Sequence, residues 1–392
     1  MKQGWEIKKL GEVCTFQRGL TYSKDDEVEH SNNCVLRSNN IDLDSMSIIL
    51  NELKYINDDF AVSEDKKVKP NTILICMSNG SKQHIGKVAF IDKEYGYAFG
   101  GFMGLIKPNT EVSPKFIYYS CISSSYKHFL AGIGNGANIT NLKFSDLQQY
   151  TLPIPPREEQ ERIVAELDCL SGIIERKREQ LRELDALAQS IFYQMFGDPI
   201  TNEKGWEVKK LGEVCISDLG KTLDSKKNKG NLYNYLCSVN VQWGYFDLTT
   251  LKEMRLEESE LERYSVKQGD LLICEGGDTG RCAIWNSEEP MYYQNALHRV
   301  RFTPNTILPI FCQYIMLYMK QNGELDKYSK GQTIKHLVKS ALMSIPIVMP
   351  HITLQQEFAE KIEAIERQKE LIKKSISEVE DLFNSRMNYY FN

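Results

Sequence analysis

The chain of 392 residues lacks the short motifs by which many enzymes hold a cofactor or a metal. It contains no G-x-x-x-x-G-K-S/T phosphate loop, no H-E-x-x-H helix and no C-x-x-C pair. Its six histidines are isolated, and its ten cysteines are scattered singly, which favours reduced, buried thiols over a structural zinc site. We therefore expect a chain that is not an enzyme and that holds no cofactor or metal of its own.

Long hydrophobic runs are also missing. No apolar segment approaches the ~20 residues that cross a bilayer. The opening sequence MKQGWEIKKL has no apolar core of the kind found in a secretory signal. These absences predict a cytoplasmic protein without a membrane partner.

Positive charge is scarce as well, because the net charge is −5. The acidic excess is confined to two segments: residues 157–196 carry 6 basic and 9 acidic side chains, and residues 355–390 carry 6 and 8. The two differences, −3 and −2, account for all of it. The rest of the chain is balanced, so the acidic total does not exclude a nucleic-acid partner.

An internal repeat organises the chain. GWEIKKLGEVC (4–14) returns as GWEVKKLGEVC (205–215), with ten of eleven positions identical. Such a repeat predicts two half-chains that share a scaffold, and the dissimilar sequence between the repeated phrases predicts that their surfaces differ. Further repeated phrases are VKPNTILIC (68–76) with VKQGDLLIC (266–274), and GANITNL (136–142) with GQTIKHL (331–337).

Each half ends in a long heptad pattern. Apolar residues recur at steps of 4 and 3 from Ile163 and from Phe358, and the two registers match at an offset of 195. A single helix of this kind would leave its apolar stripe in water, so we expect the two to pack together as an antiparallel coiled coil, roughly 60 Å long at 1.5 Å per residue. The predicted seam consists of Ile163, Leu167, Leu170, Ile174, Leu181, Leu184, Ile191, Phe358, Ile362, Ile365, Ile372, Ile376, Val379 and Phe383.

The fold class that follows is α+β. Runs rich in Ile, Val, Leu, Phe and Tyr predict strands in each half, and two further runs predict short helices. We expect two tandem, strand-rich domains joined by the two long helices with pseudo-two-fold symmetry. The predicted strands include 72–77, 87–92, 271–275 and 298–302, the short helices are 115–124 and 309–320, and the domain boundaries are 1–152, 153–198 (helix), 199–346 and 347–392 (helix).

Polar loops in both halves are candidate nucleic-acid contacts. Arg and Lys bind guanine O6 and N7 or phosphate, and Asn and Gln bind adenine N6 and N7. A single loop of this kind is more often ordinary solvated surface, but these loops occupy equivalent places in the two halves. The candidate DNA-binding residues are Arg18, Arg37, Ser38, Asn39, Asn40, Ser81, Lys82, Gln83, His84, Lys87, Lys221, Lys226, Lys227, Lys229, Asn240, Gln242, Thr279, Arg281, Gln294, Asn295 and His298.

Two fragments weakly resemble enzyme motifs. Asp270 and Glu275 are spaced like a nuclease carboxylate pair, but no lysine follows at the required distance. GDPI (197–200) lacks the second proline and the aromatic residue of an amino-methyltransferase motif. Two alternatives to a DNA-binding subunit remain open: a two-headed coiled-coil scaffold or adaptor without DNA specificity, and a self-contained enzyme with an unrecognised site.

The order of these motifs resembles the specificity subunit of type I restriction-modification systems. The resemblance rests on the repeated opening phrase, on VKQGDLLI (266–273), and on the proline-flanked helix starts LPIPPREEQ (152–160) and IPIVMPHITLQQ (345–356). It covers essentially the whole chain, and the junction FGDPITNEKGWEVKKLGEV (196–214) is especially close to that of the family.

The resemblance implies a non-enzymatic subunit with two target-recognition domains. Each domain would read one half of a bipartite double-stranded DNA target through the major groove, and the paired helices would set the gap. The implied partners are two methyltransferase subunits, which methylate adenine with S-adenosylmethionine, and restriction/translocase subunits that use ATP and Mg. The lack of a strongly basic domain predicts that the chain alone binds DNA weakly and in a salt-sensitive way.

Overall fold

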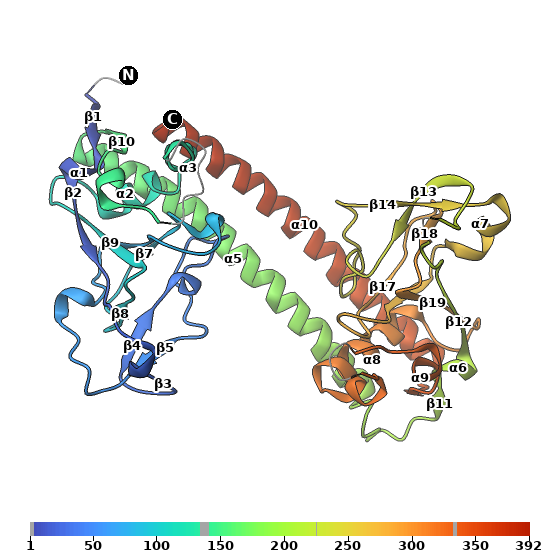
Figure 1. The fold of residues 1–392 in the computed structure, drawn as a ribbon. Helices are drawn as coiled ribbons and strands as arrows, with labels where there is room; N and C mark the ends of the chain where they lie inside the picture. The colour runs from blue at the N-terminus through green and yellow to red at the C-terminus, as the bar shows by residue number, and fades with distance from the viewer. Residues whose placement is uncertain (1–3, 134–140, 225, 332–334) are drawn as a thin grey trace. The chain divides into compact units, whose positions relative to one another are not determined.

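The computed structural model describes residues 4–133, 141–224, 226–331 and 335–392, and Figure 1 shows its elements. The phrases GANITNL and GQTIKHL fall partly outside these ranges, so their match stays a sequence observation. The chain divides into two compact units. The first contains Met1–Arg178 with Lys374–Asn392, and the second contains Glu179–Lys373.

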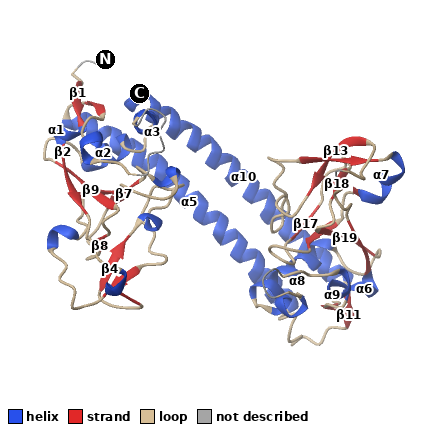
Figure 2. Cartoon of the chain, viewed as in Figure 1, coloured by secondary structure: helices blue, strands red, loops and turns tan. Residues whose placement is uncertain are grey.

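The first unit arranges its strands in three small sheets, seen in red in Figure 2. Their strand orders are β1-β10, β2-β9-β6-β7 and β3-β5-β4-β8. β4 pairs with β8 in parallel, and the other pairs are antiparallel. The elements are β1 (Glu6–Lys9), α1 (Leu10–Val13), β2 (Cys14–Arg18), β3 (Glu27–Val28), β4 (Asn33–Leu36), β5 (Lys54–Ile56), β6 (Thr72–Cys76), β7 (Val88–Ile91), β8 (Ala98–Phe99), β9 (Met103–Pro108), α2 (Pro114–Ser120), α3 (Ser124–Gly132), α4 (Phe144–Leu147) and β10 (Thr151–Ile154).

The second unit follows the same plan. Its strand orders are β11-β20, β12-β19-β16-β17 and β14-β13-β18-β15, and the parallel pair is now β13 with β18. The sequence repeat is therefore a repeat of structure, except that β3 pairs at one edge of its sheet and β15 at the opposite edge of the corresponding sheet. The elements are β11 (Val208–Lys210), α6 (Leu211–Val214), β12 (Cys215–Leu219), β13 (Asn231–Leu236), β14 (Lys252–Leu256), α7 (Glu258–Tyr264), β15 (Ser265–Val266), β16 (Leu271–Cys274), β17 (Cys282–Ile284), β18 (Met291–Tyr293), β19 (Leu297–Phe302), α8 (Pro309–Gln321), α9 (Lys339–Met343) and β20 (Pro346–Val348).

Two long helices, α5 (Arg157–Phe196) and α10 (Ile352–Phe391), each contain 40 residues. In the first unit Arg178 of α5 bonds to Glu380 of α10 at 2.8 Å, and in the second unit Lys369 of α10 bonds to Asp185 of α5 at 2.7 Å. Numbers rise along one helix as they fall along the other, so the helices pack antiparallel, as predicted. Every predicted seam residue is buried or half-buried.

Each long helix also completes the hydrophobic core of a strand-rich domain. In the first unit, Ile163 and Leu167 of α5 and Tyr390 of α10 share one buried cluster with Ile73 of β6 and Phe116 of α2. In the second, Phe192 of α5 and Phe358 of α10 join Phe311 of α8. Complete burial of a large apolar side chain contributes roughly 1.5–3 kcal/mol to the free energy of folding. The helices are therefore part of each domain's core.

A glutamine fixes the start of each long helix. Gln160 accepts a hydrogen bond from the backbone N–H of Ser113 at 2.7 Å and donates one to the carbonyl of Pro155 at 2.9 Å. Gln355 makes the equivalent pair of bonds, at 2.9 Å each. The prolines that precede both helices lack an N–H and fix the chain direction, which suits a helix N-terminus.

Most predicted elements are confirmed. Strands β6, β7, β16 and β19 and helix α8 lie where the apolar runs placed them. The helix expected at 115–124 is wrong in extent, because a turn at 121–123 separates α2 from α3. The long helices begin later than 153 and 347, because β10 and β20 pair with β1 and β11 just before them. Among the described residues, no helix is long and apolar enough to span a membrane.

Candidate nucleic-acid interface

A tight loop follows β4 in the first unit, at 36–41, and β13 in the second unit, at 236–241. The buried side chain of Asn40 accepts a bond from the Arg37 N–H at 2.9 Å and donates to the carbonyls of Ile49 and Asn51 at 3.1 and 3.0 Å. Asn240 repeats these bonds, accepting from the Cys237 N–H at 3.0 Å and donating to two carbonyls at 2.9 and 3.0 Å. The two asparagines give both loops one shape.

A cationic side chain, buried in the first unit and half-buried in the second, bonds to each of these loops. In the first unit, the ammonium of Lys87 donates to the carbonyl of Ile41 at 2.7 Å, and burial lowers the pKa of this lysine. In the second, the guanidinium of Arg281 donates to the carbonyl of Ser238 at 2.8 Å. Both cations come from the end of the loop that follows β6 or β16. Each unit therefore ties two loops together in the same way.

The second loop of the first unit runs from Ser78 to Lys87 and touches the first. Asn79 donates to the Ser38 hydroxyl at 2.8 Å. The backbone N–H groups of Met77 and Ser78 both donate to the carbonyl of Phe102, at 2.9 and 3.1 Å. The Phe102 side chain is 74% exposed. An exposed aromatic ring, on a backbone that is bonded to the second loop, therefore stands beside the two polar loops.

The second unit presents different side chains at these places. Trp243 donates from its indole N–H to Asp278 at 3.2 Å, which links the loop after β13 to the loop after β16. Val239 is 60% exposed where the first unit has Asn39. Ala296 occupies the position that Phe102 has in the first unit. Its carbonyl accepts a hydrogen bond from the backbone N–H of Glu275 at 2.9 Å. The scaffold is shared, and the exposed chemistry is not.

Partner atoms are missing for several polar groups in these loops. Among the described residues, the Nε atoms of Arg37 and Arg281 and Nδ1 of His84 are buried without a hydrogen-bond partner. Unsatisfied buried donors cost about 1–3 kcal/mol each, and a binding partner can supply the missing acceptor. Their concentration in these loops favours an interface there.

Burial separates the predicted DNA-binding residues into two groups. The exposed or half-exposed group is available for contact: Arg18, Arg37, Ser38, Asn39, Ser81, Lys82, Gln83, His84, Lys226, Lys227, Lys229, Gln242, Arg281, Gln294 and Asn295. The other group is buried: Asn40, Lys87, Lys221, Asn240, Thr279 and His298.

The buried side chains make contacts inside the protein. Lys221 forms an ion pair with Glu260 and thereby lowers the pKa of that carboxyl. Thr279 accepts from Ser329 at 3.2 Å. His298 lies 2.8 Å, through Nε2, from the carbonyl of Leu337, and burial lowers its pKa. Direct DNA contact by these residues stays a prediction, and in this structure their polar atoms are bonded within the domain.

The structure gathers the first-unit candidates of loops 36–41 and 78–87 into one surface, with Arg18 apart at the end of β2. In the second unit, Lys226, Lys227 and Lys229 lie in the loop between β12 and β13. Sequence reasoning missed Phe102 and Val239. Alignment of the two halves on their buried asparagines and strands, rather than a search for polar residues, would have found both.

The weak enzyme signals gain no support. Asp270 lies just before β16 and forms an ion pair with Arg301 at 2.6 Å, which accounts for a buried carboxylate at this position. Among the described residues, no group of three His, Cys, Asp or Glu side chains could hold a metal. Burial raises the pKa of Cys76 and Cys274, beneath the two loops, to about 11, so these thiols stay protonated and serve packing.

Comparison with known proteins finds one family along the chain. The family described as "Type I restriction modification DNA specificity domain" matches residues 2–185 and 203–381. The EcoKI specificity subunit of Escherichia coli K12 is 25% identical over 96% of this chain and 85% of that protein. The StySPI specificity subunit of Salmonella potsdam is 23% identical over 98% of this chain and 87% of that protein.

Solved structures agree at the level of the fold. The S subunit of a type I restriction-modification system from M. genitalium has a TM-score of 0.56 at 16% identity, covering 99% of this chain and 96% of that one. A chain from a study of "complex assembly andconformational transition of the type I R-M system" has a TM-score of 0.58 at 17% identity, covering 99% and 97%.

Proposed function

The chain belongs to the type I restriction-modification DNA specificity family as a specificity subunit, the non-catalytic component of such an enzyme, and from this premise we propose that each domain reads one half of a split DNA sequence. The observation that carries this proposal is the repeated pair of loops, held by Asn40 and Lys87 in one domain and by Asn240 and Arg281 in the other.

The exposed side chains on these loops suit the major groove. In the first domain, Arg37 and Lys82 match guanine or phosphate, and Asn39 and Gln83 match adenine. Phe102 adds an apolar surface of the kind that contacts a thymine methyl group. In the second domain, Gln242 and Arg281 are the polar readers and Val239 the apolar one. Different side chains on one scaffold give two different half-sites.

The two helices would then set the distance between the half-sites. A helix of 40 residues is roughly 60 Å long at 1.5 Å per residue. Major-groove readers that bind one face of DNA need centres about 34–36 Å apart. A helix pair of this length is long enough for this spacing, and a seam that keeps one register along both helices would hold the spacing constant.

The chain is part of a type I complex with other subunits. In our proposal its partners are two methyltransferase subunits, which bring S-adenosylmethionine and methylate adenine, and restriction/translocase subunits, which bring ATP and Mg. The acidic outer faces of the helices suit protein contacts better than DNA. The complex would act in the cytoplasm on double-stranded DNA, and the chain alone would bind that DNA weakly and in a salt-sensitive way.

A map of adenine methylation tests the proposal. Cells that express this chain with its methyltransferase subunit are expected to carry a split motif with a fixed gap, absent from cells without the chain. If methylation is missing or the same in both, the DNA-reading role is refuted, and the two-headed scaffold becomes the better description.

A further inference from the structure

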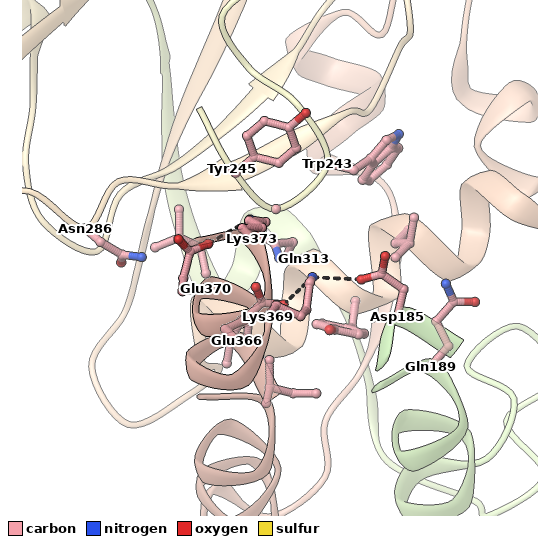
Figure 3. A pocket seen from close by; sticks show the side chains of 16 residues that line it. Asp185, Gln189, Trp243, Tyr245, Asn286, Gln313, Glu366, Lys369, Glu370 and Lys373 are labelled. Carbon is pink, nitrogen blue, oxygen red and sulfur yellow. Dashed lines mark hydrogen bonds and ion pairs between the residues drawn. The ribbon is translucent and has the colours of Figure 1, made fainter. Parts of the chain in front are cut away.

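The second domain contains a cavity of about 440 Å³ that the DNA-reading loops do not use. Trp243 and Tyr245 lie along one side, α8 contributes Gln313, and the charged faces of α5 and α10 close the other side (Figure 3). All of its lining residues belong to the second unit. The cavity is open to solvent, since Tyr245 is 58% exposed.

The first domain fills the equivalent space with aromatic rings. PKFIYYS of α2 matches PIFCQYI of α8, so Tyr118 stands where α8 has Gln313. The Tyr118 hydroxyl donates to the carbonyl of Met46 at 3.0 Å, and its ring lies 5.8 Å from that of Phe90. By strand register, Ile284 takes the place of Phe90 in the second domain. Two smaller side chains therefore open the cavity.

Gln313 brings an unused acceptor to this cavity. The residue is only 8% exposed, and its Oε1 is a buried atom without a hydrogen-bond partner among the described residues. A buried amide oxygen without a partner costs about 1–3 kcal/mol. A ligand with a hydrogen-bond donor would remove that cost.

The charges around the cavity favour a cation. Lys369 bonds to Asp185 at 2.7 Å and to Glu366 at 2.8 Å, and Lys373 bonds to Glu370 at 2.7 Å, as the dashed lines in Figure 3 show. Carboxylates thus outnumber amines by three to two. The Lys373 ammonium also lies 5.9 Å from the centre of the Tyr245 ring, so the aromatic wall already accepts one cation.

We propose that this cavity receives the guanidinium group of an arginine from the methyltransferase subunit of the complex. A guanidinium is planar, carries five N–H donors, stacks on aromatic rings and pairs with carboxylates. It can donate to the Gln313 oxygen and to a carboxylate of α5 or α10 while its face lies against Trp243 or Tyr245. The source of the arginine rests on the proposed function, whereas the chemistry of the cavity does not.

The test begins with the purified full chain and a small probe. Nα-acetyl-arginine amide is titrated at constant ionic strength, and the four tryptophan indole N–H signals are followed by NMR. The Trp243 signal is expected to shift in a saturable way, and those of Trp5, Trp206 and Trp285 to stay in place. Nα-acetyl-citrulline amide, which has the same shape without the charge, should bind at least tenfold more weakly.

Substitutions of Gln313 test whether its amide oxygen accepts a hydrogen bond from the probe. Gln313→Leu is expected to weaken binding of the arginine probe at least tenfold, and Gln313→Glu, which keeps an acceptor and adds charge, to retain or tighten it. Gln321→Leu places the same change on the exposed end of α8 and should have no effect. Equal binding of the two probes, or binding unchanged in Gln313→Leu, would overturn the guanidinium site.

Binding to the methyltransferase subunit tests whether that subunit supplies the arginine. Gln313→Leu should weaken association of the chain with its methyltransferase subunit at least tenfold, while the methylated sequence stays the same. If the arginine probe binds but association is unchanged, the assignment to a partner subunit is overturned. Loss of the sequence motif itself would instead concern the DNA-reading function, so the two proposals fail in distinguishable ways.

Discussion

The loop after β4 in the first domain and the loop after β13 in the second are held by the same bonds and expose different side chains. Asn40 and Asn240 each bond to one N–H of their loop and to two carbonyls of the segment that follows it. Beside these fixed points, the first domain exposes Phe102 and the second exposes Val239. Different residues therefore fix the shape of the loop and form its exposed surface, so the same scaffold can present two different recognition surfaces.

The same comparison applies away from the loops. Where the first domain packs Tyr118 against Phe90, the second has Gln313 and Ile284 and a cavity. Protein interiors are normally packed to the density of organic crystals, so a space that is filled in one copy and open in the other indicates a difference in use. The predictions below test how far the two domains share structure while they differ in function.

The largest effect is expected from shortening the helix pair. Removing residues 174–180 and 374–380 takes one heptad from each helix at the level where Arg178 bonds Glu380. The seam register is kept, and the rod shortens by about 10 Å, or roughly three base pairs. Methylation of the original motif should be lost. It should appear instead at a motif with the same two half-sites and a gap about three base pairs shorter. An unchanged gap would show that the helices do not set the spacing.

Breaking one loop should affect one domain only. Asn40→Ala leaves the Arg37 N–H and two carbonyls without partners, which should cost the first domain roughly 2–3 kcal/mol. Hydrogen exchange resolved by peptide should show faster exchange in the first domain and no change in the second, with the reverse for Asn240→Ala.

The neighbouring residue provides the control for this pair. Asn39 is exposed, so Asn39→Ala should change stability by less than about 0.5 kcal/mol. Equal losses for Asn39→Ala and Asn40→Ala would mean that the buried bonds do not shape the loop.

Removing the exposed ring should alter reading without loss of stability. Phe102→Ala is expected to lower affinity of the assembled complex for its target about tenfold, within the ~1–3 kcal/mol of a good base contact. The change should concern bases of one half-site only, measured by binding to a set of single-base variants. Ile216→Ala, which removes another exposed apolar side chain, is the control and should leave binding unaltered.

The smallest effect is a difference in pH response. Burial holds the pKa of His298 below its ordinary value of 6.5, so the unfolded chain binds the proton more readily than the folded one. The contribution of His298 to the stability of the second domain should therefore be complete above pH 6.5 and fall as the pH drops below 6.5, by up to about 1.4 kcal/mol per pH unit.

The first domain has Gly104 at the position of His298, and its His84, whose pKa burial also lowers, is only half-buried, so a smaller loss in the same direction is expected there. The measurement is hydrogen exchange in the core strands of each domain at several pH values. His298→Asn should flatten the slope of the second domain. A steeper loss in the first domain, or a slope that persists in the variant, would contradict this account of the histidine.

The parts of the fold that could be predicted are those that show in the periodicity and the internal repeat of the sequence. The heptads from Ile163 and Phe358 predicted both long helices, their antiparallel packing and their seam, because the apolar stripe of each helix is buried when the two helices pack together. The runs 72–77 and 271–275 placed central strands for the same reason. β1 and β10 were missed because Glu6–Lys9 is polar and pairs only with a strand that is distant in the sequence.

The site was less predictable, because residue type does not reveal burial. Asn40 and Asn39 are adjacent and identical in chemistry, yet one braces the loop and the other faces solvent. His298 and Lys221 look like DNA ligands in the sequence and are bonded inside the domain. Phe102 was missed because a search for polar groups ignores a ring whose exposure is fixed by backbone bonds to another loop.

An exchange of recognition surfaces tests the central claim most directly. Residues 15–135 are replaced by the corresponding segment of another specificity subunit with a different target, and adenine methylation is mapped across the genome. If each domain reads independently, one half of the motif changes, and the other half and the gap stay the same. A change in both halves would contradict two independent readers on a shared scaffold.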